Sequence, residues 1–118
     1  MDWQNLYFNY SGRVNRQPYW WGSLALGLIQ LVLLFLIAVT LGTGFDTTRF
    51  NVLEALLSLF FLYPALAVTT KRWHDRDKSG WWNLILLVPV IGAIWMTVEC
   101  GFLRGTNGLN RFGPDPLA

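Results

Sequence analysis

The sequence predicts an all-α integral membrane protein, a helical bundle of three spans with a short interfacial segment at its amino terminus. Hydrophobic residues make up 53% of the 118-residue chain and charged residues only 14%, against roughly a quarter in ordinary soluble domains. The apolar residues lie in long runs, and most basic residues flank these runs. A soluble helical protein would need amphipathic helices with charged outer faces, and the sequence has none of useful length.

The amino-terminal eighteen residues precede the first apolar run. Within them Trp3, Leu6, Tyr7 and Tyr10 recur with the i, i+3, i+4, i+7 spacing of one helix face, which predicts a short helix lying in the membrane interface. The first span is predicted at about residues 19–42, because this uncharged run exceeds the ~20 residues that a helix needs to cross a bilayer.

The second span is predicted at residues 52–70, with a kink at Pro64. The third is predicted at residues 79–103, where Pro89 and Gly92 leave two interpretations open. A kinked full crossing is favoured by the length of the run, and a re-entrant hairpin is the alternative. A polar tail, residues 104–118, is rich in turn-forming glycine and proline. The whole chain, residues 1–118, is predicted to form a single membrane domain.

The distribution of basic residues predicts the orientation. Arginines precede the first span and four bases lie between the second and third, whereas Asp46 balances Arg49 in the other loop. By the positive-inside rule the amino terminus and the segment 71–78 face the cytoplasm. Tryptophan prefers the membrane interface, and five tryptophans would lie on this same side: Trp20, Trp21, Trp73, Trp81 and Trp82.

The segment "KRWHDRDK", residues 71–78, is interpreted as a charged loop facing water, whose acids pair with its own bases. A zinc site takes three or four ligands, and His74 with Asp75 and Asp77 lacks the further histidines that a metal or hydrolytic centre needs. We therefore expect no catalytic residues, no metal ligands and no cofactor. The single cysteine, Cys100, lies in an apolar stretch and is expected to be a buried, inert thiol.

Few polar residues fall within the predicted spans. Gln30 should face another helix, and Ser23 with Gly27 forms a small-xxx-small pair suited to close helix contact. Two acids, Glu54 and Glu99, are expected at the outer ends of the second and third spans, where Arg49 or Arg104 could pair with them.

Three stretches together resemble a known family: "SGRVNRQPYWW", "RWHDRDKSGWW" and "GTNGLNRFGPDP". Their order and the tail pattern are similar to domain-of-unknown-function family 805, the YhaH-like small inner-membrane proteins of bacteria. The resemblance implies a bacterial cytoplasmic membrane location and a few-helix fold, and it implies no reaction. The middle motif departs from the family where Trp73 replaces a leucine.

The candidate site is an interfacial motif that either contacts lipid head groups or forms a structural latch. For the latch we expect Asp75 to bond Arg13 or Arg16 in a fork-to-fork pair. Arg111 beside the segment 71–78 would rule out a full third span. The candidate residues are Arg13, Arg16, Arg72, His74, Asp75, Arg76, Lys78, Asn110, Arg111 and Asp115.

The sequence favours a non-enzymatic membrane interaction or assembly module in contact with the bilayer. The clustered bases are interpreted first as the signal that orients the chain, and contact with anionic lipid head groups is the alternative. Its expected partners are lipid, a second copy of the chain or another membrane protein, and not nucleic acid. Two alternatives remain. One is a component of a small oligomeric transporter or channel, and the other is a membrane-interface enzyme using His74 and Asp75.

Overall fold

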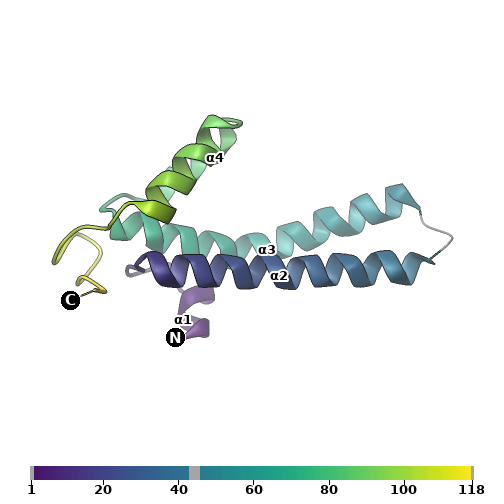
Figure 1. The fold of residues 1–118 in the computed structure, drawn as a ribbon, viewed down its shortest axis with the longest axis horizontal. Coiled ribbons are helices and arrows are strands. Elements are labelled where there is room, and N and C mark those ends of the chain that lie inside the picture. Colours follow the sequence, from purple (N-terminus) through teal and green to yellow (C-terminus); the bar gives the residue numbers. More distant parts are fainter. Residues whose placement is uncertain (1, 43–45, 118) are drawn as a thin grey trace.

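The computed structural model describes residues 2–42 and 46–117. Its elements are six helical segments and, among the described residues, no β-strand, so the all-α prediction is confirmed. The molecule is elongated, 56 × 31 × 19 Å, with two long helices side by side and a short hairpin rising from one end (Figure 1). The segments are α1 (Trp3–Phe8), α2 (Arg16–Leu41), α3 (Thr47–Asp75), the 3-10 helix η2 (Gly80–Leu87), α4 (Ile91–Met96) and the π-helical η3 (Thr97–Phe102).

The antiparallel pair α2 and α3 forms the body of the molecule. With 26 and 29 residues, the helices extend ~39 and ~44 Å, more than the ~30 Å of bilayer hydrocarbon. They are the two helices of the described chain that are long and apolar enough to span a membrane. Gln30 of α2 donates to Ser58 Oγ of α3 at 3.1 Å, so the prediction that Gln30 faces another helix is confirmed. Asp46 caps α3 by accepting from the backbone N–H of Thr48.

The predicted water-facing loop at residues 71–78 is wrong over most of its length. Helix α3 continues five residues past the predicted end of the span, to Asp75, and all of Lys71–Asp75 is buried. Only a tight turn follows, in which Asp77 adopts a positive φ of 59°. Buried charge at a helix end requires partners, and both the amino-terminal residues and the later parts of the chain supply them.

The favoured full third span is also wrong, because residues 79–103 form the hairpin alternative. Ser79 caps the ascending arm η2, and the arm ends at Leu87. The chain reverses at Val90, whose φ of 65° and ψ of −61° define a strained γ-turn closed by Ile91 N–H donating to Pro89 O at 2.7 Å. The descending arm, α4 and η3, returns to the level of Asp75. We call residues 79–103 the hairpin.

Gly92 lets the two arms of the hairpin meet. A Cβ on Gly92 would lie 1.8 Å from the carbonyl oxygen of Ile85 on the other arm, closer than any real side chain allows. By contrast, a Cβ on Gly27 would meet nothing within 4 Å, so the close helix contact expected at Ser23 and Gly27 does not occur within the chain. Those two residues instead line an open groove of about 340 Å³ between α2 and α3.

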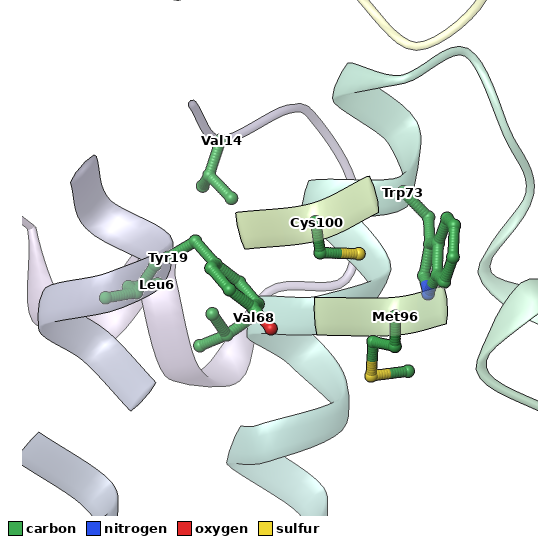
Figure 2. Close-up of a cluster of buried hydrophobic side chains, with 7 residues drawn as sticks. All are labelled: Leu6, Val14, Tyr19, Val68, Trp73, Met96 and Cys100. Carbon is green, nitrogen blue, oxygen red and sulfur yellow. The ribbon is translucent and has the colours of Figure 1, made fainter. Parts of the chain in front are cut away.

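The hydrophobic core lies at the end of the molecule where the hairpin joins the long helices. Figure 2 shows side chains from several segments converging there. Trp73 and Cys100 are fully buried, and the buried thiol is as predicted. The core consists of Leu6, Val14, Tyr19, Val68, Trp73, Met96 and Cys100. Elsewhere α2, α3 and the hairpin expose large apolar side chains, as a protein immersed in lipid requires.

The predicted amino-terminal helix is present as α1, with Asp2 as its cap. It packs against α3 through Leu6, and Tyr7 donates its hydroxyl to Gly22 O of α2 at 2.8 Å. The buried Lys71 reaches the opposite end of α1, where Nζ donates to Leu6 O at 2.6 Å and also to Asn5 O. These carbonyls lack partners within a short helix, and a cation there stabilises the helix end.

Candidate functional site: a buried arginine node

A carboxylate held between two arginines forms the centre of the site. Arg72 and Asp75 lie one turn apart near the end of α3, and Arg72 Nη1 donates to Asp75 Oδ2 at 2.6 Å. Arg13 lies in the amino-terminal linker, the segment between α1 and α2. Its Nε is 3.0 Å and its Nη2 is 2.9 Å from Asp75 Oδ1. The predicted bond between Asp75 and Arg13 is therefore confirmed, but its fork-to-fork geometry is wrong, because both Arg13 nitrogens approach the same carboxylate oxygen. We call Arg13, Arg72 and Asp75 the arginine node.

The node is closed to solvent. The three side chains are 1%, 0% and 3% exposed, and two guanidinium groups against one carboxylate leave an excess positive charge. Burying that charge is unfavourable unless the remaining donors are hydrogen-bonded. Backbone carbonyl oxygens of the hairpin and the tail accept from these donors, so the excess charge is solvated by peptide dipoles.

Arg13 holds the tail. Its Nη1 donates to Gly108 O at 2.7 Å and Gly113 O at 3.1 Å, and Nη2 donates to Thr106 O at 2.6 Å. Only a planar group with several fixed donors can bind a carboxylate and three carbonyls at once. The tail therefore folds around Arg13.

The descending arm of the hairpin ends against cationic and indole donors. Four consecutive carbonyls, those of residues 100–103, each accept from a different nitrogen. Arg72 donates from Nε to Cys100 O at 2.6 Å and from Nη2 to Leu103 O. Trp20 Nε1 donates to Gly101 O at 2.8 Å and Arg16 Nη1 donates to Phe102 O at 2.9 Å. These carbonyls have no hydrogen-bond partner within the helix that they end. The side-chain nitrogens supply the missing hydrogen bonds and so stabilise the carboxyl end of η3.

The tail makes further bonds around the turn that follows α3. Thr106 N–H donates to Asp75 O at 2.6 Å, and Asn110 Nδ2 donates to His74 O at 2.9 Å. Arg111 lies beside the turn, with Nε 3.2 Å from Asp77 Oδ1 and Nη2 2.8 Å from Asp77 O. Because Arg111 and the 71–78 segment are in contact, the tail and the end of α3 must lie on the same side of any membrane.

Asp115 organises the tail itself. Its carboxylate accepts from the backbone N–H groups of Leu117 at 2.9 Å and Gly108 at 3.0 Å, and Arg104 lies 3.9 Å away. Hydrogen bonds to the charged form lower the pKa of Asp115, first from Leu117 and then from Gly108.

The imidazole of His74 has a structural role. Its Nδ1 lies 2.9 Å from Gly12 O, so this nitrogen carries a proton, since a carbonyl can only accept. Its imidazole stacks on Phe112 with centroids 3.9 Å apart and planes 3° from parallel. Both oxygens of the neighbouring Asp75 already accept from arginines, which opposes a role as general base. Within residues 2–42 and 46–117 no group of three metal-ligating side chains gathers.

A second charged cluster lies beside the node, where the sequence placed none. The sequence predicts Glu99 at the outer end of a third span, far from the segment 71–78, but the hairpin returns it to the end of the molecule that holds the arginine node. There its buried carboxylate accepts from Trp95 Nε1 at 2.9 Å and forms ion pairs with Lys78 Nζ at 2.5 Å and Arg76 Nε at 3.6 Å. The other acid for which an arginine partner was expected, Glu54, instead accepts a hydrogen bond from Ser58 Oγ of the same helix at 2.9 Å.

The structure brings all ten predicted site residues to one end of the molecule. It adds three that the sequence analysis missed: Lys71, Trp20 and Glu99. The sequence alone predicts Lys71 in a charged loop, Trp20 only at the membrane interface and Glu99 at the opposite end of a span. For Lys71 and Glu99 the sequence does contain a signal. Each charge adjoins a long apolar run, and a charge in that position needs a partner elsewhere in the chain.

Apolar helices with their buried charges gathered at one end define a helical membrane protein. A family model, "Protein of unknown function (DUF805)", matches residues 7–114, and the chain belongs to this family. It is 38% identical to inner membrane protein YhaH of Escherichia coli K12, covering 98% of this chain and 97% of the relative. It is 35% identical to inner membrane protein YhaI of the same strain, covering 93% and 87%. No solved structure matches.

Proposed function

We propose that the protein is a non-enzymatic interaction and assembly module of the bacterial inner membrane, with its amino terminus and arginine node at the cytoplasmic face. In this arrangement α2 and α3 cross the bilayer and the hairpin enters only the cytoplasmic leaflet. The observation that carries the proposal is the contact between Arg13 of the amino-terminal linker, Asp75 of α3 and Thr106 of the tail. These three segments must share one membrane face.

The distribution of charge supports this orientation. Every basic residue except Arg49 lies at the node end, and the positive-inside rule favours the cytoplasm for that end. Arg13, Lys71 and Arg72 are buried by internal partners, so contact with anionic lipid head groups falls to the exposed bases. Arg16, Arg104 and Arg111 are exposed at this end and would supply ~1 kcal/mol each near an anionic surface.

The hairpin provides the interaction surface. Its side chains Leu87, Val90 and Ile94 are 77%, 71% and 60% exposed, and the charged clusters hold only its base. A short apolar hairpin fixed at one membrane face offers its sides to lipid and to other membrane helices. This supports assembly with a second copy or another membrane protein as the role of the module.

A transporter role has one specific observation in its favour. Gln30, Ser58 and Glu54 form a hydrogen-bonded chain inside the helix pair, next to the groove lined by Ser23 and Gly27. Oligomerisation through that groove would bring several such chains together. We rank this role second because a conducting path needs polar groups along the full thickness of the membrane.

Impermeant thiol labelling in whole cells tests the orientation. With Cys100 replaced by serine, Asp46→Cys should be labelled from outside. Asn107→Cys, exposed in the tail, should be labelled only after the cells are made permeable. External labelling of Asn107→Cys would require a third crossing and overturn the proposal.

Photo-crosslinking tests the assembly role. A crosslinking residue at Ile94 on the hairpin should give a protein adduct of discrete mass in living cells. The same residue at Asn107 on the tail serves as the control and should give no such adduct. If Ile94 yields only lipid adducts, the assembly role is wrong.

A further inference from the structure

A crevice opens between α3 and the ascending arm of the hairpin. It has a volume of about 550 Å³. Apolar side chains from both walls line most of it, among them Leu62 and Leu66 of α3 and Leu84 and Leu87 of η2. Polar residues occur towards the node, where Thr70 and Ser79 contribute to the lining. We call this space the hairpin crevice.

The dimensions of the hairpin crevice exclude a helix as its occupant. An α-helix with its side chains is ~10 Å in diameter, so 550 Å³ would hold little more than one turn. From Thr70 to Leu62 the crevice follows α3 for ~12 Å. That length fits within one leaflet of hydrocarbon, which is half of ~30 Å.

Water is also a poor occupant. A buried water makes about three hydrogen bonds to polar groups, and the deep end of the crevice is lined by leucines. At the polar end the Asn83 amide is already engaged, since Nδ2 donates to Thr70 Oγ1 at 2.9 Å and Oδ1 accepts from Trp73 Nε1 at 3.0 Å. An empty space is unfavourable too, because its lining loses dispersion contacts.

From these observations we propose that the hairpin crevice holds one acyl chain of a bilayer phospholipid, with the polar part of the lipid at the Ser79 end. The proposal rests on the membrane placement of the hairpin proposed above. A thin, flexible hydrocarbon chain fits the length and the apolar lining, and the polar end lies at the level where a lipid has its ester groups. The acyl chain would pack between α3 and η2 and so stabilise the position of the hairpin relative to α3.

Native mass spectrometry of the purified full-length chain tests the proposal. The protein is incubated in mild detergent with palmitoyl-oleoyl phosphatidylglycerol or phosphatidylethanolamine, and retained lipid is counted per chain. Leu66→Trp fills the crevice, and Leu59→Trp is the matched control, a leucine on the same face of α3 that is outside the crevice and 66% exposed. Wild type and Leu59→Trp should retain one phospholipid, and Leu66→Trp should show at least a tenfold lower occupancy.

Other results would overturn the inference. It is wrong if Leu66→Trp retains as much lipid as wild type, if Leu59→Trp loses it equally, or if the retained mass is a free fatty acid. It is also wrong if a lipid-free dimer appears, since a second copy would then fill the space. Should Leu66→Trp fail to fold, Leu84→Trp fills the crevice from the opposite wall. Lipid loss is independent of thiol labelling, so a failed inference leaves the proposed orientation standing if Asn107→Cys is protected.

Discussion

Gly105 passes so close to Asp75 that a Cβ on the glycine would lie 2.0 Å from the carboxylate Oδ2 and 2.6 Å from the backbone oxygen of Asp75. The contact places the start of the tail directly on the arginine node. Asp75 cannot withdraw, because two guanidinium groups hold its carboxylate and Thr106 holds its backbone oxygen.

Gly105→Ala should therefore destabilise the folded protein. Overpacking a well-packed site costs ~1–3 kcal/mol, and this site has no flexible neighbour to absorb the added methyl group. The matched control is Gly27→Ala, where a Cβ meets nothing within 4 Å. Thermal unfolding in detergent micelles should show a lower midpoint for the first variant only. Equal midpoints for both would mean that the close approach does not exist in solution.

Asp75→Asn should be among the most damaging substitutions in the chain. It leaves two buried guanidinium groups without a carboxylate, and breaking a buried pair in this way costs ~3–5 kcal/mol. Asp46→Asn is the control, because its partner Arg49 is exposed and 3.8 Å away and asparagine also caps a helix well. Denaturant titration should give a change below ~1 kcal/mol for the control.

Arg13→Lys should release the tail while keeping the charge. A lysine ammonium cannot reach the carboxylate and three carbonyls together, so tryptic cleavage after Arg104 and Arg111 should accelerate. Arg16→Lys is the matched control, since Arg16 makes one carbonyl bond that an ammonium can replace. Unchanged cleavage in Arg13→Lys would show that the tail is held by other contacts.

Lys71→Met should detach α1. The substitution removes the donor to Asn5 O and Leu6 O at the end of that helix while keeping an unbranched apolar side chain. Losing ~1.4 kcal/mol of local stability increases opening tenfold. Hydrogen exchange should therefore rise in residues 3–8 and stay unchanged in the middle of α2. Uniform acceleration in both helices would instead indicate global destabilisation.

Tail order should depend on pH through Asp115. Its folded-state pKa is lowered, so its bonds contribute stability that is fully present above the unfolded pKa of about 3.9. That contribution is lost as the pH falls through the lower folded value. Hydrogen exchange at Gly108 should be protected at pH 5 and above and lose protection at lower pH. Asp115→Asn should lose protection at all pH values, and a pH response that survives this variant would point to another acid.

The long spans and the Arg13–Asp75 pair could be predicted because each has a local signal. Uncharged runs of sufficient length mark α2 and α3, and a carboxylate beside bases at a membrane face needs a fork-shaped partner. The end of α3 could not be predicted, since Lys71 and Arg72 look like hydrated loop charges until distant carbonyls are present. The sequence favours a full crossing over the hairpin, because the length of residues 79–103 suits a crossing. The close approach of Gly92 to Ile85 O distinguishes the hairpin from a full crossing, and no sequence pattern reveals it.

The arginine node and its carbonyl acceptors come from the beginning, middle and end of the chain, and this has a consequence for synthesis. Arg13 leaves the ribosome early, but its acceptors Thr106, Gly108 and Gly113 are made among the last residues. Until then the Arg13 donors that bind the tail must stay hydrated, as burying them unpaired is unfavourable. A nascent chain stopped before residue 104 would contain all the acceptors of Arg72 but would lack the tail carbonyls that bind Arg13.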